Sequence, residues 1–234
     1  MTKKNIVVLT GAGMSAESGI STFRDANGLW ENHDIMEVAS PIGWEKNKKL
    51  VLEFYNQRRR QLKNVQPNAG HFALAELETK HNVTIITQNV DNLHERAGSK
   101  NILHLHGELT KARSISYPDL VYDIGYRDIN PGDKCEKGSQ LRPHIVWFGE
   151  AVPLMDEAAQ IASTAEILII VGTSMIVYPA ASLIDYVPDS ALKYIIDPVK
   201  PSVYNTYKNL VFIEQKASIG TPELVKEILK RKEI

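Results

Sequence analysis

The chain of 234 residues has one cysteine, no long apolar run and a formal net charge of only -1. A single cysteine excludes an intrachain disulfide framework. The 27 basic and 28 acidic residues are spread along the chain, so neither a nucleic acid nor an anionic membrane is expected as a partner. No stretch approaches the ~18 apolar residues of a membrane span, and the apolar run at residues 6–9 is too short for a signal peptide. We therefore expect a cytoplasmic location. We also expect a monomer.

The chain does contain 43% hydrophobic residues, enough for a sizeable core. Five short runs rich in valine and isoleucine predict buried strands of a parallel sheet, at residues 5–10, 82–87, 166–172, 192–197 and 210–214. Helix-periodic segments lie between them, including residues 49–64 and a segment that opens with Pro222. Strands alternating with helices indicate an α/β fold with a Rossmann-like, doubly wound sheet.

Two segments interrupt this alternation. Residues 23–64 hold a loop and helices where a second strand is expected, and residues 108–141 are polar and turn-rich. Both are typical of insertions that form a smaller module beside the sheet. We therefore predict a Rossmann-like domain from residues 1–29, 66–107 and 142–234, and a small domain from residues 30–65 and 108–141.

A glycine-rich loop follows the first predicted strand. Gly11, Gly13 and Ala16 fit the G-x-G-x-x-G/A pattern, in which glycines let backbone amides approach a pyrophosphate. A tight turn without a ligand is the alternative. The pattern also calls for an acidic residue about 20 positions later at a strand end, and none is found there, which disfavours an ordinary nicotinamide-dependent dehydrogenase.

The loop that replaces the second strand contains Phe23, Arg24 and Trp30. It is long enough to fold over a dinucleotide, where Arg24 would meet phosphate or ribose and Phe23 would shield a reacting centre from water. The alternative is a surface arginine and a core phenylalanine.

Polar residues follow the later strands directly. Gln88, Asn89 and Asp91 come after residues 82–87, at the strand end where open α/β sheets bind ligands. The small residues Gly172, Thr173 and Ser174 form a similar turn after residues 166–172 and suit a phosphate or ribose. His106 would converge on the same pocket, and an imidazole there is a ready general base near neutral pH. The histidines at positions 71, 81 and 94 are interpreted as structural.

Five stretches together carry a family resemblance: GAGMSAESGISTFRDANGLW, TQNVDNLHERAG, LHG, LRPHIVWFGE and GTSMIVYPA. In this order they resemble the sirtuins, the NAD-dependent protein lysine deacylases. The resemblance implies a Rossmann-like domain, a small domain, and a cleft between them that holds NAD and an acylated lysine of a protein substrate. It also implies that the acyl oxygen attacks the nicotinamide ribose carbon, that nicotinamide leaves, and that O-acyl-ADP-ribose and free lysine are formed.

The resemblance assigns roles residue by residue. The catalytic set is His106 as the base, with Asn89 and Asp91. The cofactor-binding set is Gly11, Ala12, Gly13, Ala16, Thr22, Phe23, Arg24, Trp30, Gln88, Asn89, Val90, Asp91, Gly172, Thr173, Ser174 and Ala217. The segments that hold the peptide and line the lysine tunnel contribute Val146, Phe148, Gly149, Glu150 and Val177.

Two residues of the predicted helix at 49–64 point to the kind of acyl group. Tyr55 and Arg58 are three residues apart and share a helix face. A guanidinium grips a carboxylate and a phenol adds a hydrogen bond, which suits succinyl or malonyl groups. The spacing Y-x-x-R resembles the desuccinylase/demalonylase branch of the family. Because Arg59 and Arg60 adjoin, a solvated basic helix is the alternative.

The chain departs from the family pattern where sirtuins hold a structural zinc ion in two C-x-x-C pairs. The four positions correspond to Ser114, Tyr117, Cys135 and Gly138. One thiolate does not make such a site, so we expect no metal. Instead, a hydrophobic cluster is expected to hold the insertion, made from Tyr117, Val121, Tyr122, Ile124, Tyr126 and Ile129.

Two smaller departures lie nearer the predicted site. His104 stands where the family commonly has glutamate, and Ile195 stands where an asparagine commonly contacts the adenosine ribose.

Two other functions stay open from the residues alone. One is an NAD-dependent mono-ADP-ribosyltransferase or NAD glycohydrolase, and the other is a non-catalytic sensor of NAD or ADP-ribose.

Overall fold

A computed structural model describes residues 3–20, 29–30, 33–175, 178–201 and 207–230. Thr22, Phe23, Arg24 and Val177, and the side chain of Trp30, lie outside the described residues. Within them, no helix is long and apolar enough to cross a membrane.

The predicted α/β fold with a parallel sheet is confirmed. Its six strands have the order β11-β10-β9-β1-β4-β5, and every pairing between neighbours is parallel. The strands are β1 (Asn5–Thr10), β4 (Asn82–Thr87), β5 (Ile102–His104), β9 (Ile167–Val171), β10 (Leu192–Ile196) and β11 (Leu210–Ile213). The three-residue β5 was not predicted, because its side chains are only partly buried and it carries a histidine.

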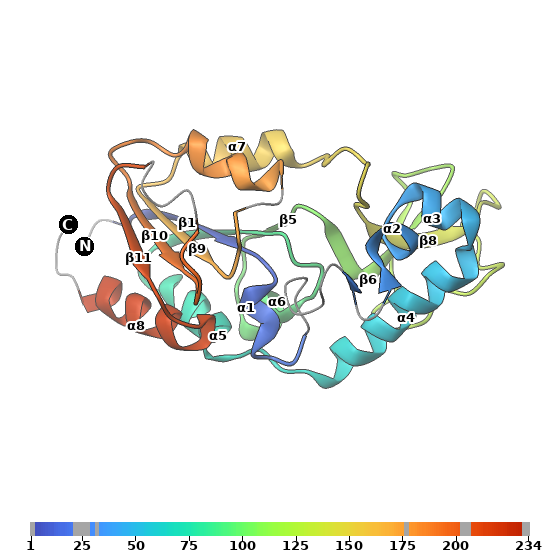
Figure 1. Cartoon of the computed structure of the whole chain (residues 1–234), viewed down its shortest axis with the longest axis horizontal. Coiled ribbons are helices and arrows are strands. Elements are labelled where there is room, and N and C mark those ends of the chain that lie inside the picture. The colour runs from blue at the N-terminus through green and yellow to red at the C-terminus, as the bar shows by residue number, and fades with distance from the viewer. Residues whose placement is uncertain (1–2, 21–28, 31–32, 176–177, 202–206, 231–234) are drawn as a thin grey trace.

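Helices cover both faces of this sheet (Figure 1). On one face lie α5 (Ala69–Leu77) and α8 (Ala217–Lys230), and on the other lie α7 (Met155–Ser163) and the 3-10 helix η1 (Ala180–Tyr186). The alternating residues of β1 divide between the two cores: Ile6 and Val8 face α5 and α8, whereas Val7 and Leu9 face α7. The short helices α1 (Gly13–Ala16) and α6 (Leu93–Ala97) follow β1 and β4.

The start predicted for the last helix is wrong. Helix α8 begins at Ala217, and Pro222 lies inside it. The earlier start is stabilised from a distant part of the chain, since the backbone amide of Ser218 donates to the Glu17 carboxylate over 2.9 Å. A carboxylate at a helix N-terminus satisfies a backbone donor that has no partner within the helix.

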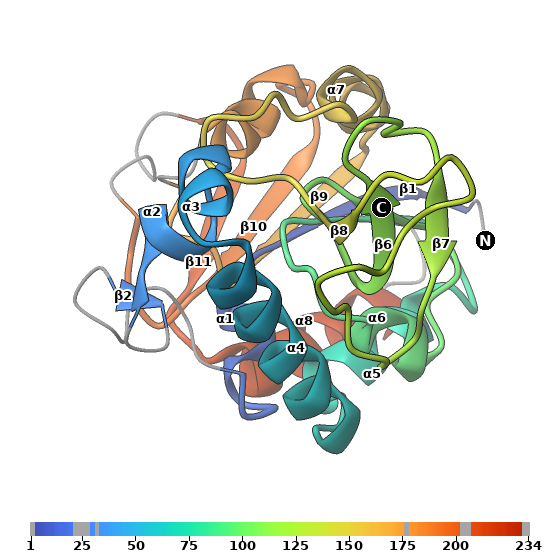
Figure 2. The same ribbon diagram turned by 90° about the vertical axis from the view of Figure 1, so that its right-hand side faces the viewer.

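The two insertions form a module at one end of the sheet (Figure 1, Figure 2). It consists of β2 (Leu29–Trp30), β3 (His33–Asp34), α2 (Ile35–Val38), α3 (Pro41–Lys46), α4 (Lys48–Asn64), β6 (Gly107–Ser114), β7 (Val121–Asp123) and β8 (Leu141–Ile145). The strands β7, β6 and β8 form an antiparallel sheet beside α4, and the module has its own hydrophobic core. The exact domain boundaries given above stay a prediction.

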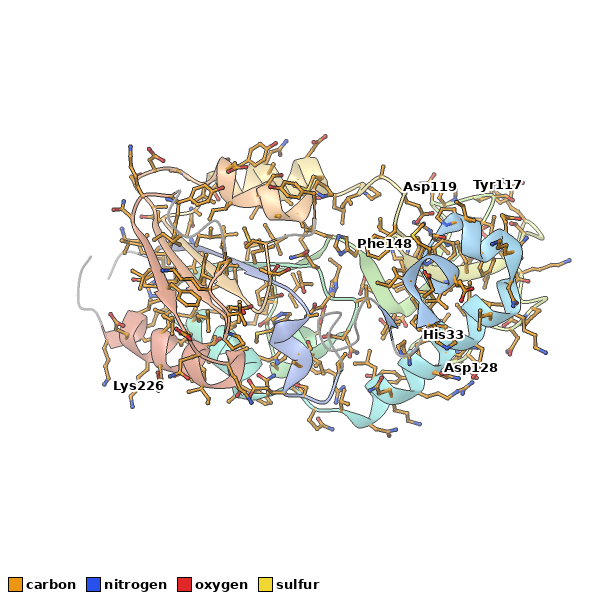
Figure 3. All side chains as sticks on the ribbon, viewed as in Figure 1. His33, Tyr117, Asp119, Asp128, Phe148 and Lys226 are labelled. Carbon is orange, nitrogen blue, oxygen red and sulfur yellow. The ribbon has the colours of Figure 1, made fainter. Side chains whose placement is uncertain are left out.

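Part of the expected hydrophobic cluster is present in this core. Ile124 and Ile129 are buried in it, and Tyr122 and Tyr126 pack against it. The prediction is wrong for Tyr117 and Val121, which are each 40% exposed. Figure 3 shows Tyr117 at the end of the module that is far from the parallel sheet.

Two adjacent arginines of α4 have different surroundings, so the helix is not a uniformly solvated basic surface. Arg60 is exposed and pairs with Glu53 and Asp128. Arg59 is fully buried, where it donates to Asn56 and to the Leu109 carbonyl. Burial lowers the pKa of Arg59 to about 10.

Two neighbouring histidines, His71 and His94, are buried beneath the sheet with ring centroids 4.9 Å apart. The His71 Nδ1 atom accepts from the Asn68 backbone amide and closes the capping box of α5. The His94 Nε2 atom lies 3.1 Å from Thr10 Oγ1. Burial lowers the pKa of His71 to about 4 and the pKa of His94 well below its ordinary value.

We predict that the free energy of unfolding falls as the pH drops below 6.5. The unfolded chain protonates His71 near its ordinary pKa while the folded chain does not, so protons favour the unfolded state between pH 6.5 and 4. For His71 alone the loss between pH 7 and 4.5 is about 2 kcal/mol. Urea unfolding at several pH values measures it. Equal slopes for wild type and His71→Asn would contradict the assignment.

Candidate functional site

A cavity of about 960 Å³ opens at the carboxyl ends of the parallel strands, between the sheet and the module. Most of the residues predicted for the site line it. These are Gly11, Ala12, Gly13, Ala16, Tyr55, Arg58, Gln88, Asn89, Val90, Asp91, His106, Val146, Phe148, Gly149, Glu150, Gly172, Thr173, Ser174 and Ala217. Figure 3 shows Phe148 on the side of the module that faces the sheet. The fold therefore brings residues that are far apart in the sequence to one cavity.

The glycine-rich loops after β1 and β9 touch each other at the floor of the cavity. The Gly13 amide donates to the Gly172 carbonyl over 2.8 Å. A Cβ atom on Gly13 would lie 2.7 Å from Gly172 Cα, and one on Gly172, where φ is +62°, would lie 2.3 Å from Met14 N. No larger residue fits at either position without a shift of the backbone. This close approach leaves backbone, rather than side chains, facing the cavity, as a bound pyrophosphate requires.

The polar residues after β4 are held by a buried hydrogen-bond network. Ser15 Oγ donates to Asp91 Oδ2 over 2.8 Å, and Asn89 Nδ2 donates to Ser15 Oγ and to the Gly11 carbonyl. Burial raises the pKa of Asp91, although hydrogen bonds from Leu93 N and Ser15 Oγ partly oppose this. This network thus fixes the Asn89 amide and the Asp91 carboxyl group against the glycine loop.

The candidate base His106 is fixed in one tautomer. Its Nδ1 atom lies 3.1 Å from the Gln88 carbonyl, which only accepts, so Nδ1 carries a proton in this hydrogen bond. The neutral ring then keeps its lone pair on Nε2. Burial lowers the pKa of His106, so the ring is neutral at pH 7 and ready to accept a proton.

Tyr55 and Arg58 lie together on the module side of the cavity. Tyr55 is fully buried, and its hydroxyl accepts a hydrogen bond from Trp147 Nε1 over 3.0 Å. The Arg58 guanidinium lies 4.3 Å from the centroid of the Phe54 ring and donates to the Phe54 carbonyl over 3.3 Å. Burial raises the pKa of Tyr55, which keeps the phenol protonated.

Glu150 reaches the cavity, but its carboxylate already has several partners. Arg142 Nη1 lies 2.6 Å from it, Arg113 Nη2 lies 3.2 Å away, and the Trp147 amide donates to it. Burial acts to raise the pKa of Glu150, but the Arg142 and Trp147 hydrogen bonds outweigh it and the pKa is lowered. Arg142 also stacks on the Trp147 ring at 3.2 Å from the centroid. Glu150 therefore fixes the loop that carries Trp147.

The cavity residues that the prediction missed include Ser15, Trp147 and Asp197. Serine in a glycine-rich loop and tryptophan between predicted peptide-binding residues were both visible in the sequence. Asp197 follows β10 directly, is 1% exposed, and accepts from the Val199 amide over 2.9 Å. The placement of Ile195 at the cofactor is wrong, because it lies within β10 and is buried in the hydrophobic core. Asp197, directly after this strand, lines the cavity instead.

The four positions that correspond to zinc ligands do lie near one another. Cys135 Sγ is 3.4 Å from Ser114 Oγ, the Tyr117 amide donates to the same oxygen, and the Gly138 amide donates to the Cys135 carbonyl. A hydroxyl group, an exposed phenol and a glycine do not replace three thiolates. This donor set does not fit a structural zinc ion.

We predict that Gly172→Ala weakens the binding of NAD, the ligand that the resemblance implies, because a Cβ there would force the two glycine loops apart. Gly125→Ala is the matched control: its φ of +55° imposes a similar strain of about 1–2 kcal/mol, but no atom lies within 4 Å of its Cβ. Calorimetric titration with NAD measures the effect. Equal NAD affinity in the two variants would contradict the role of the loop contact.

Known proteins resemble the chain along its length. The Sir2 family model matches residues 11–179. An NAD-dependent protein deacylase of Helicobacter pylori (strain ATCC 700392 / 26695) is 58% identical over 227 residues, 97% of this chain and 98% of the relative. The solved NAD complex of a Sir2 homologue has a TM-score of 0.86 at 40% identity, covering 96% of this chain and 89% of that one. Sir2Tm bound to a propionylated peptide has a TM-score of 0.78 at 28% identity, covering 95% and 92%. From a match of this extent, we conclude that the chain belongs to the Sir2 family.

Proposed function

We propose that this NAD-dependent protein deacylase removes acidic acyl groups, succinyl and malonyl, from lysine side chains of proteins. The acyl group passes to ADP-ribose, nicotinamide is released, and acetyl groups are a further, weaker substrate. The observation that carries the proposal is that Tyr55 and Arg58 line the cavity side by side. Acetyl-lysine offers no group for the guanidinium to bind.

The surroundings of Arg58 favour an anionic ligand. Its stacking on Phe54 and its bond to the Phe54 carbonyl fix the direction of the guanidinium, which lowers the entropy lost when it binds a carboxylate. The wall of the cavity that Arg58 lines is largely apolar and includes Val90, Leu109 and Ile145. Charge-assisted hydrogen bonds are stronger where water is excluded.

The reacting centre is proposed to lie between His106 and the residues after β4. NAD supplies the ribose carbon that receives the acyl oxygen and the hydroxyl that is later activated. His106 Nε2 accepts the proton from that hydroxyl, because Nδ1 is held by Gln88. Asn89 and Asp91 hold the ribose and the nicotinamide side, and Gly11, Gly13 and Gly172–Ser174 face the phosphates. We propose that Asp197 and Ala217, which both line the cavity, contact the adenosine end.

The substrate peptide is proposed to lie between Val146, Phe148 and Gly149 and the turn after β9. Phe148 is 44% exposed at the rim of the cavity, which suits an apolar contact with a bound segment. A Sir2 homologue of similar fold binds a propionylated peptide, which supports an acylated peptide as the partner. A cytoplasmic location and a monomeric state complete the proposal.

We also propose that packing, rather than zinc, holds residues 108–141 in place. Ile124 and Ile129 are buried against α4. The Asn56 side chain adds two hydrogen bonds to the backbone of Ile129, at 3.0 Å to its carbonyl and 2.9 Å from its amide. Arg60 also pairs with Asp128. These contacts join the insertion to the helix that carries Tyr55 and Arg58.

We expect mass spectrometry of acetyl, malonyl, succinyl and glutaryl peptides with NAD to show fastest turnover for succinyl or malonyl. Arg58→Met should lower acidic deacylation at least tenfold and leave deacetylation nearly unchanged, since a charged hydrogen bond of about 1.5–3 kcal/mol is lost only for acidic groups. His106→Ala should abolish turnover of all four peptides. Dominant acetyl turnover that is insensitive to Arg58→Met would refute the acyl preference. ADP-ribosylated protein without deacylated peptide would refute the reaction.

A separate prediction concerns the module. Ile129→Ala should reduce the free energy of unfolding by about 2–5 kcal/mol, as expected for a truncated core isoleucine. Val121→Ala, at a site that is 40% exposed, should cost far less. Chelators should leave the melting temperature of the wild type unchanged. Stoichiometric zinc in purified, tag-free protein would contradict the proposal.

A further inference from the structure

A second histidine, His104, lies two residues before the candidate base and faces a different partner. Its Nδ1 atom lies 3.2 Å from the Asn89 carbonyl, and its Nε2 atom lies 2.6 Å from Glu95 Oε1 on α6. The carbonyl only accepts, so Nδ1 carries a proton. A carboxylate at hydrogen-bond distance from Nε2 favours a second proton there. The His104 side chain is only 9% exposed.

The segment that His104 contacts is held at three consecutive carbonyls. His106 Nδ1 donates to the Gln88 carbonyl, His104 Nδ1 donates to the Asn89 carbonyl, and the Leu109 amide donates to the Val90 carbonyl over 2.8 Å. Of these three bonds, only the one from His104 comes from a ring whose other nitrogen is paired with a carboxylate, that of Glu95. Charge-assisted hydrogen bonds are roughly twice as strong as neutral ones.

We propose that the Glu95–His104 pair positions the Asn89–Asp91 segment for NAD binding. The pair fixes this segment against the glycine loop while His104 is protonated, and the segment loosens when His104 loses its second proton. His104 itself does not touch the reacting atoms. The inference rests on the proposed assignment of Asn89 and Asp91 to the ribose and nicotinamide side of NAD.

The charges around His104 support this. Burial acts to lower its pKa, but the hydrogen bond to Glu95 and the charges of Glu95 and Glu108 outweigh it, so the pKa is raised. The His104 charge in turn acts to lower the pKa of the buried Asp91. Lys111 lies 2.5 Å from Glu108, and His94 is the other titratable group on α6 that interacts with His104. As the pH rises through the pKa of His104, Asp91 loses a cation and Asn89 loses a charge-assisted bond.

The cluster of Glu95, His104 and Glu108 is not assigned to a metal ion. Their side-chain nitrogen and oxygen atoms do lie within 4.8 Å of one another. The carboxylates, however, already bind His104 and Lys111 respectively. The measurements are therefore made with a chelator present, so that the effect of the pair alone is observed.

The test compares the titration of His104 with the pH dependence of NAD binding. In wild type, NMR should give a His104 midpoint above the ordinary value, and calorimetry should show NAD affinity falling as the pH rises through that midpoint. In Glu95→Gln, both the midpoint and the fall in affinity should move down together by ~1–2 pH units, as expected when one close opposite charge is removed. Glu157→Gln on the exposed side of α7 should move neither.

Several results would overturn the inference. One is a His104 midpoint that moves in Glu95→Gln while NAD affinity keeps its wild-type pH dependence. Others are a midpoint that does not move, or the same shift in Glu157→Gln, which would assign the effect to net charge. The readout needs no turnover. Coupled titration without deacylation of any peptide would refute the proposed function alone, whereas deacylation with NAD affinity independent of the charge on His104 would refute this inference alone.

Discussion

The site depends on the way the segment after β4 is held by the residues from the end of β5 to the start of β6. The carbonyls of Gln88, Asn89 and Val90 accept from His106, His104 and Leu109. These bonds fix the tautomer of the candidate base and the position of Asn89 together. Because β6 continues from the same segment into the module, they also tie the module to the sheet. One set of hydrogen bonds thus sets the geometry on both sides of the cavity.

On the module side, the geometry of the site depends on α4 and on the loop after β8. Arg59 secures α4 to β6, Asn56 secures it to the segment after β7, and Trp147 Nε1 donates to the Tyr55 hydroxyl. Trp147 is in turn held by Glu150 and Arg142. At the four positions that correspond by resemblance to zinc ligands, the donor set has one thiol. Packing and buried polar contacts are sufficient to explain how Tyr55 and Arg58 are oriented.

Much of this was predictable from the sequence, for identifiable reasons. The five long strands were found because buried parallel strands are continuous apolar runs. Residues at strand ends, such as Asn89 and Thr173, were placed correctly at one cavity because parallel strands end at the same edge. The loop residues Phe23 and Arg24 lie outside the described residues, so their roles stay predictions.

Other features depend on long-range contacts that no local pattern reveals. The start of α8 is set by Glu17, some 200 positions away in the chain. Tyr117 and Val121 were expected in the core from their apolar character, but their strand and turn direct them to solvent. The sequence analysis put Ile195 at the cofactor, two positions before the residue that lines the cavity. That residue is Asp197, which lies just beyond the last paired position of β10, at the edge of the sheet where ligands bind. The pairing of His104 with Glu95 required the tertiary structure.

The central claim is that Arg58 and Tyr55 receive the carboxylate of an acidic acyl group. A crystal structure of the protein with NAD and a succinyl-lysine peptide tests it most directly. The account predicts succinyl carboxylate oxygens within ~3.2 Å of the Arg58 guanidinium and the Tyr55 hydroxyl. A succinyl carboxylate that points to solvent, or that binds elsewhere in the cavity, would contradict it.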